Sequence, residues 1–429
     1  MNRKEYGHKI HFGIIWLTAV SMPWPVAITS TAVALLGLSW LLNCSAKEKI
    51  AKLKRNWIVW LFVGLYLLYV VGLLYSEQTT RGLFVIEKLI PLILIPLAIG
   101  GYRKLSNDEI NYVQFGFVAS CLLASLLCIA YASTGFIAGS DSLTAANFDY
   151  FTQSAYLRNN PDAGELWQFV SYIHLGKPFS LHPTYFSLYL LVCIIILITN
   201  DRIRTTLKLV LIPCLSIIII LLSSRIAIVS LALIGLVLIV TLFKGTPARA
   251  ALASAGFLVL VIGCTLVNPV TRFRLWQEPF EKSTMGNSAT NWNSVSIRLL
   301  QWNAGLSVLE NNWPAGTGTG DVTMVMDKHL KNHPSGRWPN STANAHNQFL
   351  QTGAELGMIG LIGLMACITL PFWYGLKKGN HALLLFLTVF TLSCMTESML
   401  ERQKGIVCFS FFTSFFLFSF PKARPLSWK

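Results

Sequence analysis

The stretch IIWLTAVSMPWPVAITSTAVALLGLSWLL, residues 14–42, decides the fold class of this chain. It holds two apolar runs separated by the turn signal SMPWP, and no small-residue cleavage site of the kind that ends a signal peptide follows the first run. Each run approaches the length needed to cross a hydrocarbon core of about 30 Å. We therefore expect two membrane helices joined by a tight hairpin of re-entrant appearance.

The rest of the chain repeats this pattern. Hydrophobic residues make up 54% and charged residues only 12%, against roughly 25% charged in an ordinary soluble protein. The sequence predicts an all-α polytopic membrane protein with about 12 transmembrane helices. We expect the spans near residues 11–22, 26–43, 57–75, 83–101, 111–133, 183–199, 209–223, 226–243, 250–267, 356–376, 381–399 and 406–420.

The distribution of charge predicts the orientation. The net charge of +15 would suit nucleic acid, but Lys and Arg gather at both termini and in short loops such as SAKEKIAKLKRN (45–56) and NDRIRTTLK (200–208). An excess of Lys and Arg in short loops marks the cytoplasmic side. We therefore expect cytoplasmic termini, long loops on the periplasmic or outer side, membrane lipids as surroundings and no nucleic-acid partner. The nine cysteines fall in or beside apolar segments, which argues against a disulfide framework or a thiolate metal site.

Two long polar segments divide the chain into three expected regions. Residues 1–267 hold nine spans and an outer loop at 134–182, residues 268–355 form a large outer loop, and residues 356–429 hold three spans and a tail. Loops of this length are usually functional or disordered. Because the large loop contains a helical pattern, SVSIRLLQWNAGLSVLENN (294–312), we expect it to be ordered and functional.

Two patterns in the large loop resemble known binding motifs without completing them. GTGTGD (316–321) lacks the Lys-Ser/Thr ending of a phosphate loop, so we expect a tight turn whose backbone amides lie near a substrate. HLKNH (329–333) places two histidines at i and i+4 but offers no glutamate and no third ligand. No metal site and no cofactor are predicted.

The candidate for acid–base chemistry is His346, in NAHNQFLQTGAELGMIG (344–360). If one helix ran from His346, Gly353, Gly357 and Gly360 would lie within about 40° of its direction. That helix would present the imidazole on a close-packing glycine face. The alternative from spacing alone is a histidine that caps the helix or lies in the membrane interface.

This stretch also carries a family resemblance. His346 and Asn347, nine further residues and then Gly357-Met-Ile-Gly360 resemble the signature of the O-antigen ligase and O-antigen polymerase superfamily. Two arginine contexts look similar to patterns of the same family, namely Arg225 in LLSSRIAIVSLALI and Arg298 at the start of the loop helix. Motifs cover roughly residues 180–375, and the topology resembles the family throughout.

The resemblance implies a GT-C-like, metal-independent glycosyltransferase of the bacterial inner membrane. Such an enzyme moves a glycan from undecaprenyl diphosphate to an acceptor at the periplasmic face. In this reading His346 deprotonates the acceptor hydroxyl, and Arg225 and Arg298 bind the diphosphate, which suits bidentate arginine contacts. The structural alternatives are a headgroup anchor for Arg225 and a solvated helix face for Arg298.

Four further residues are candidates for substrate binding: Arg81, Lys88, Asn347 and His182. Arg81 and Lys88 are seven apart on one expected helix, where they would support the phosphate site unless Glu87 pairs with them. A charge at membrane depth is a functional hypothesis by default. His182 precedes Pro183, so a helix-start role is the alternative.

The acceptor stays open at the level of sequence. A ligase would use lipid A-core oligosaccharide, a polymerase would extend a polysaccharide, and an oligosaccharyltransferase would modify protein hydroxyls, all with the same donor. A transporter is the alternative of a different class. Transporters commonly contain inverted repeats, and the sequence shows none.

Overall fold

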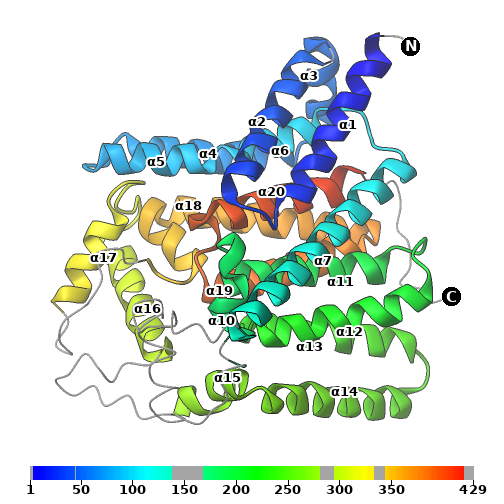
Figure 1. Ribbon diagram of the computed structural model, residues 1–429. Coiled ribbons are helices and arrows are strands. Elements are labelled where there is room, and N and C mark those ends of the chain that lie inside the picture. Colours follow the sequence, from blue (N-terminus) through cyan, green and yellow to red (C-terminus); the bar gives the residue numbers. More distant parts are fainter. Residues whose placement is uncertain are drawn as a thin grey trace. The chain divides into compact units, whose positions relative to one another are not determined.

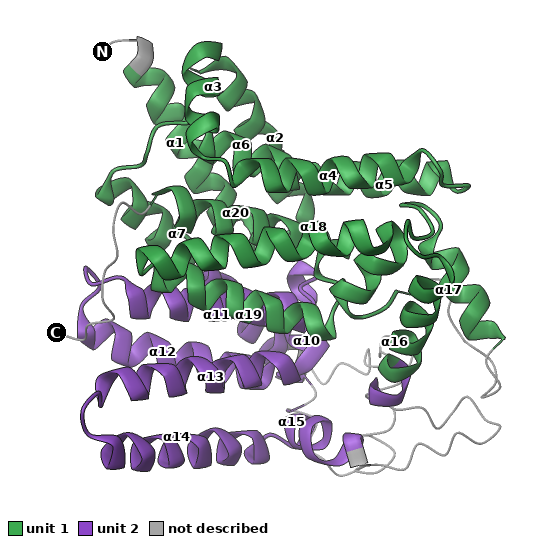
Figure 2. Ribbon diagram, turned by 180° about the vertical axis from the view of Figure 1, so that it is seen from behind, with its two compact units in different colours: residues 1–120, 298–424 green, residues 121–297, 425–429 purple. Residues whose placement is uncertain are grey.

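The structure is a computed structural model that describes residues 3–43, 45–137, 167, 169–280, 294–332 and 344–419. Every regular element in these ranges is helical, as the sequence predicted. The chain divides into two compact units, residues 1–120 with 298–424 and residues 121–297 with 425–429 (Figure 2). Helices α7 and α16 each run across a boundary between the two units.

Unit 1 is built from both ends of the chain (Figure 1). Its N-terminal elements are α1 (Arg3–Ser21), α2 (Val26–Leu42), α3 (Ala46–Arg55), α4 (Val59–Leu73), α5 (Thr79–Leu89), α6 (Pro91–Gly100) and the first part of α7 (Asn107–Ile137). Its later elements are α16 (Ser294–Asn311), α17 (Val322–Lys331), α18 (Gln348–Lys378), α19 (His381–Thr396), η6 (Met399–Glu401) and α20 (Gln403–Ser419).

Helix α20 forms the centre of unit 1. Every residue from Lys404 to Ser419 is buried, as expected for a helix that is apolar on all sides. The Phe409 ring stacks on Phe390 of α19 at 4.5 Å between ring centroids, and it also contacts Phe62 of α4. The Lys404 ammonium donates to the carbonyl of Trp24, after α1, at 2.7 Å. The first and last helices of the described chain therefore share one core.

Unit 2 contains four apolar helices, α11 to α14, that run side by side (Figure 1). Its described elements, besides the second part of α7, are α10 (Tyr172–Gly176), η2 (Lys177–Phe179), α11 (Pro183–Thr199), α12 (Thr205–Leu221), α13 (Arg225–Leu242), α14 (Pro247–Val267), α15 (Pro269–Arg272), the π-helical turn η3 (Phe273–Gln277) and η4 (Glu278–Phe280).

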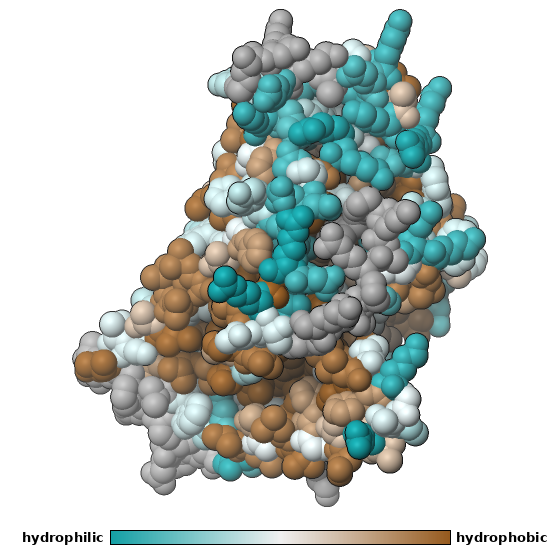
Figure 3. Space-filling view, turned by 90° about the vertical axis from the view of Figure 1, so that its right-hand side faces the viewer, coloured by the Kyte–Doolittle hydropathy of each residue, from teal (hydrophilic) through white to brown (hydrophobic). Residues whose placement is uncertain are grey.

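The apolar surface of the protein supports a membrane environment. Leu252, Val259 and Val267 of α14 are each more than two thirds exposed, and Figure 3 shows apolar side chains spread over a broad part of one face. Exposed apolar area of this extent marks an interaction surface. By length and composition, five described helices can cross a membrane, or up to seven if each of two bent pairs forms one span.

Each predicted span has a helix, but several boundaries differ. Four of the apolar helices, α4, α12, α19 and α20, are shorter than 18 residues, so the count of 12 stays a prediction. The expected span at 83–101 lies within Thr79–Gly100, which is long and apolar enough to cross a membrane; α5 and α6 are separated within it only at Ile90, because Pro91 has no amide to donate. The expected span at 356–376 begins earlier, at Gln348.

Candidate functional site

The backbone at His346 differs from the predicted helix. His346 has a φ of +42° and lies outside α18, whose N-cap is Asn347 and whose first residue is Gln348. Its amide donates to Oδ1 of Asn344 at 2.9 Å. Helix α18 is then interrupted at Gly357, where φ is +63° and ψ is −156°. The expected shared face of His346 and the glycines is therefore wrong, because no continuous helix joins them.

The glycines near His346 instead allow close packing within the protein. A Cβ at Gly353 would lie 3.3 Å from Leu309 of α16, and a Cβ at Gly305 would lie 3.2 Å from that of Ala345. Gly357 lies against the carbonyl of Pro314. These contacts hold α16 and the turn after it against α18. In this stretch the glycines therefore pack against protein rather than lipid.

His346 forms a pair with a carboxylate that the sequence reasoning missed. Its Nδ1 lies 3.3 Å from Oε2 of Glu397, whose side chain is 10% exposed, whereas that of His346 is 31% exposed. Glu397 is the C-cap of α19. The side-chain Nδ2 of Asn347 donates to the carbonyl of Met395 at 3.2 Å and so connects the start of α18 to the end of α19. A carboxylate at Nδ1 fixes the imidazole and leaves Nε2 to act as a base.

Helix α16 reaches the same histidine. The indole Nε1 of Trp302 donates to the carbonyl of His346 at 3.3 Å. Arg298 lies one turn earlier on α16, hence on the same side of that helix as Trp302. Arg298 is half-buried, and no described residue forms a hydrogen bond or ion pair with its guanidinium. Unit 1 thus places Arg298, which has no partner among the described residues, one helical turn from the residue that contacts His346.

The GTGTGD turn has a structural role. The amides of Thr317 and Gly318 donate to the carbonyls of Ala354 and Glu355, at 2.9 Å each. The amide of Gly320 donates to Oγ of Ser76, at 3.1 Å. Those of Gly316, Thr319 and Asp321 donate to other protein carbonyls. All six amides of the turn donate to protein acceptors, so none is left to bind a substrate; that the turn lies near a substrate stays a prediction.

The same turn joins α18 to the start of α5. The Asp321 carboxylate accepts from the amides of Glu77 and Gln78, at 2.8 and 2.7 Å. Arg81 donates to Oγ1 of Thr323 at 2.8 Å. Arg81 and Lys88 both lie on α5, as predicted. The carboxylate within ion-pair distance of Lys88 is Glu401, at 3.0 Å, in place of the suggested Glu87.

The arginine at the start of α13 is held by unit 2. Arg225 donates from Nη2 to Glu278 (2.7 Å), from Nε to the carbonyl of Arg274 (2.8 Å) and from Nη1 to Ser294 (3.1 Å). Glu278 is 1% exposed and also accepts from the amide of Ser294 at 2.8 Å. Arg225 therefore already has a carboxylate partner.

His182 starts helix α11. Its Nδ1 accepts from the amide of Thr184 at 3.4 Å, and Pro183 occupies the first helical position. The geometry corresponds to the helix-start alternative. A direct contact with substrate stays a prediction.

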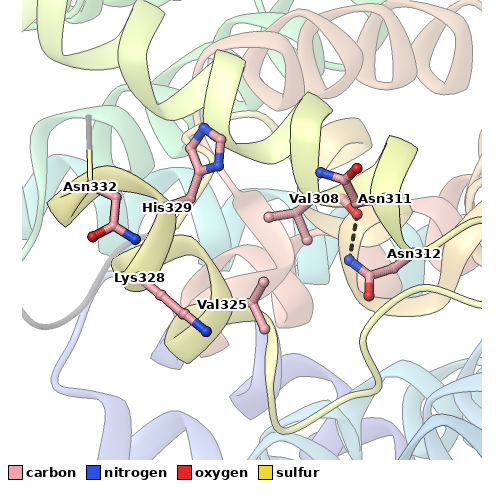
Figure 4. Close-up of a pocket in the computed structure, with 7 residues that line it drawn as sticks. All are labelled: Val308, Asn311, Asn312, Val325, Lys328, His329 and Asn332. Carbon is pink, nitrogen blue, oxygen red and sulfur yellow. Dashed lines mark hydrogen bonds between the residues drawn. The ribbon is translucent and has the colours of Figure 1, made fainter. Parts of the chain in front are cut away.

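Two pockets flank α17 in unit 1. One, of about 390 Å³, lies between α16 and α17 and is lined by Val308, Asn311, Val325 and His329 among others (Figure 4). There the Asn312 side chain donates to the carbonyl of Val308 at 2.8 Å. The partner histidine of HLKNH, at position 333, lies outside the described residues. Within those residues, no group of three or more His, Cys, Asp or Glu could hold a metal ion.

The second pocket, of about 490 Å³, lies between α5 and α17. Its lining includes Arg81, Lys328 and Lys331, with Asp327 as the single acidic residue. Three cations around one cavity favour an anionic occupant. No sequence motif predicted this pocket, because α5 and α17 are about 240 residues apart in the chain.

Part of the chain matches a known protein family. Residues 209–365 match a family model described as O-antigen ligase. The matched segment runs from α12 into α18 and includes Arg225, Arg298 and His346, whereas Glu397 lies beyond it. None of the curated proteins matches the chain.

Proposed function

We propose that this chain belongs to the O-antigen ligase superfamily, whose model residues 209–365 match, and that it transfers a glycan from undecaprenyl diphosphate to lipid A-core oligosaccharide. The family implies a glycosyltransferase of the ligase or polymerase type in a membrane. We also propose the details of this function: the donor and the acceptor, a reaction that requires no metal, and a protein of the inner membrane with cytoplasmic termini and a periplasmic site. The observation that supports them is the His346–Glu397 pair, together with the contact of Trp302 with His346 one helical turn after Arg298, which has no partner among the described residues.

In the proposed reaction one glycosidic bond forms, one bond to the diphosphate breaks and one proton is transferred. An acceptor hydroxyl oxygen attacks the anomeric carbon of the donor glycan and forms the new glycosidic bond. The bond between that carbon and the diphosphate oxygen breaks, and its electron pair leaves with the lipid diphosphate. The hydroxyl proton passes to Nε2 of His346, while Glu397 stabilises the imidazolium through Nδ1–H.

Arginine side chains stabilise the leaving diphosphate. Arg298 suits this role because its guanidinium has no described partner to release. Arg225 is assigned to the same diphosphate on the family resemblance. For that contact, a phosphate would have to replace Glu278 or Ser294, which now occupy its Nη2 and Nη1.

The proposed substrate-binding residues contribute in two ways. Arg81 lines the basic pocket beside α17, which suits an anionic group on the acceptor. Lys88, Asn347 and His182 contact protein groups instead, at Glu401, at the start of α18 and at the start of α11. We propose that these three position the helices that carry the site.

Purified components test the function directly. The detergent-solubilised protein is incubated with undecaprenyl-diphosphate glycan and, in separate reactions, with lipid A-core, free polysaccharide or a Ser/Thr peptide. Product on lipid A-core alone supports the ligase. Chain extension without it indicates a polymerase, and a modified peptide an oligosaccharyltransferase. Movement of intact donor across a vesicle membrane without any product would favour a transporter.

Glu397→Gln is expected to lower kcat by about 10- to 100-fold, the range found when a carboxylate that orients a metal-bound histidine is removed. The amide keeps the size of the side chain but removes the charge that stabilises the imidazolium. Because Glu397 acts through His346, the KM for donor and acceptor should stay near wild type. Glu310→Gln, on α16, is the matched control. A fall in folded yield with unchanged kcat would show that Glu397 only supports the fold.

Arg298→Lys is expected to lower kcat/KM for the donor by about tenfold, since an ammonium cannot reproduce bidentate phosphate contacts. The measurement is initial rate against donor concentration at saturating acceptor. Arg55→Lys, at the end of α3, serves as the control. Unchanged kinetics in Arg298→Lys would assign Arg298 to a solvated helix face.

A further inference from the structure

Arg274 is a buried arginine that the catalytic assignment does not use. It lies on the π-helical turn η3 and is 5% exposed. Its Nε donates to the carbonyl of Ser223 at 3.3 Å, and its guanidinium lies 3.5 Å from the centroid of the Tyr172 ring. Its buried Nη1 has no hydrogen-bond partner within the described part of the chain. A buried guanidinium nitrogen without an acceptor is a costly group that proteins rarely retain without a reason.

The charges around Arg274 do not balance. Arg225 is tied to Arg274 through the latter's carbonyl, and the carboxylate of Glu278 pairs with Arg225. No ion pair forms between Arg274 and any carboxylate of the described chain. Among the described residues, Glu278 is the carboxylate that pairs with Arg225, and Arg274 forms no ion pair of its own. An uncompensated buried cation costs several kcal/mol, and an external anion at Nη1 would remove that cost.

The residues that hold Arg274 are themselves fixed in uncommon conformations. Tyr172 and Ser223, which contact its guanidinium, have φ values of +52° and +51°, a region that residues other than glycine rarely adopt. The Ser223 hydroxyl lies 2.8 Å from that of Thr271, and Asn268 donates to Ser171 at 2.9 Å. Strained backbone held by surrounding contacts is a common property of binding sites.

The surroundings favour an anion that carries a lipid. Helix α14 ends immediately before α15 and η3, and Val267 at its last position is 70% exposed. Trp276, two residues after Arg274, is partly exposed and donates from Nε1 to Thr265 at 3.1 Å. Tryptophan with a bonded polar end is typical of the membrane interface. An apolar chain along α14 would bring its head group to this level.

We propose that Arg274 binds a phosphate group of a lipid-linked diphosphate through Nη1, in a subsite formed with Tyr172 and Ser223. This inference rests on the proposed function, because it assigns the donor's diphosphate to a residue of unit 2. Tyr172 covers one face of the guanidinium and the Ser223 carbonyl accepts from Nε, so Nη1 is a buried donor that a tetrahedral oxyanion would satisfy. The sequence reasoning did not single out Arg274, whose local pattern TRFRLWQ matches no phosphate motif.

Binding to the purified full-length protein tests this subsite without any transfer step. Intrinsic tryptophan fluorescence or native mass spectrometry follows titration with undecaprenyl diphosphate, undecaprenol, inorganic diphosphate and phosphatidylglycerol. Arg274→Lys is expected to weaken undecaprenyl diphosphate binding by tenfold or more. Arg272→Lys, at an exposed position of α15, should bind it as wild type does.

The ligands separate the contribution of the diphosphate group from that of the lipid chain. Inorganic diphosphate should show the same dependence on Arg274 with lower affinity, and undecaprenol should bind wild type and Arg274→Lys equally. Wild-type affinity of Arg274→Lys for undecaprenyl diphosphate would overturn the subsite. So would an effect seen only with phosphatidylglycerol, which would indicate a general lipid head-group site.

Two further variants keep the test interpretable. If Arg274→Lys does not fold, Tyr172→Leu keeps the charge and should weaken the same binding severalfold by removing the cation–π contact; unchanged affinity would count against the proposal. His346→Ala should bind the donor normally while failing to transfer it. If wild type binds the donor through Arg274 but transfers it to no acceptor, the proposed function fails while the subsite stands.

Discussion

His346→Ala is expected to lower the rate of glycan transfer by about 100- to 10,000-fold, the range that general-base catalysis contributes. The methyl group cannot accept the proton of the acceptor hydroxyl, and Glu397 is left without its imidazole partner. Donor and acceptor binding should persist, because His346 contacts the proton in transit rather than the lipid. The measurement is product formation under single-turnover conditions with saturating donor.

The matched control lies at the other end of the helix that carries Glu397. His381→Ala, at the first position of α19, removes an imidazole about 24 Å along that helix. It should retain wild-type rates. Full activity in a properly inserted His346→Ala protein would refute the base assignment and return His346 to the role of a residue before a helix cap.

Gly357→Ala is expected to destabilise unit 1 strongly. At φ +63° an L-residue is strained by about 1–3 kcal/mol, and the new Cβ would overlap the carbonyl of Pro314. That carbonyl accepts from the amide of Met358 at 3.0 Å, so it cannot move away without breaking the contact between the turn and α18. We expect a melting temperature lower by roughly 5 °C or more and a reduced folded yield.

Gly64→Ala is the control for this change. Gly64 lies in α4, which packs on α18 in the same unit, and a Cβ there would meet no atom within 4 Å. Its stability should be unchanged or slightly raised, because alanine favours the helix over glycine. If both variants melted alike, the break at Gly357 would not be needed for folding.

The helices were predictable because the apolar blocks alone specify them. Each expected span contains a helix, and the hairpin after residue 21 connects α1 to α2 as anticipated. What the pattern could not give was the break at Gly357, since it leaves the average hydropathy of the segment unchanged. Whether every apolar helix crosses the membrane depends on bilayer thickness and tilt, which sequence does not encode.

The candidate site was predictable in its residue types but not in its contacts. The motif identified His346, yet its partner Glu397 lies 51 positions later, at the end of a different helix. An acidic residue directly after an apolar span was the available signal, because charge is costly at that depth. The same limit applies to Arg225: nothing in LLSSRIAIVSLALI indicates that Glu278 will occupy its guanidinium.

The GTGTGD turn shows how composition alone can mislead. Its glycines suggested amides that face a ligand, whereas they allow the backbones of α4, α5 and α18 to approach the turn. Gly316 and Gly318 have φ values of +76° and +98°, which only glycine tolerates without strain. Glycine is required both where two backbone segments approach closely and where a backbone approaches a phosphate. The sequence therefore could not distinguish these two roles.

The arrangement of unit 1 has a consequence for biosynthesis. Its first segment ends at residue 120, and the centre that this segment packs around, α20, is translated only after residue 402. At a translation rate of about 5–20 residues per second, roughly 15–60 s pass between the synthesis of the N-terminal helices and the synthesis of α20. During that interval α1, α2, α4 and α6 lack their central partner, and insertion chaperones or surrounding lipid must shield them. Premature termination between Glu397 and Gln403 would therefore leave a protein that has all its candidate catalytic side chains but lacks the helix around which unit 1 packs.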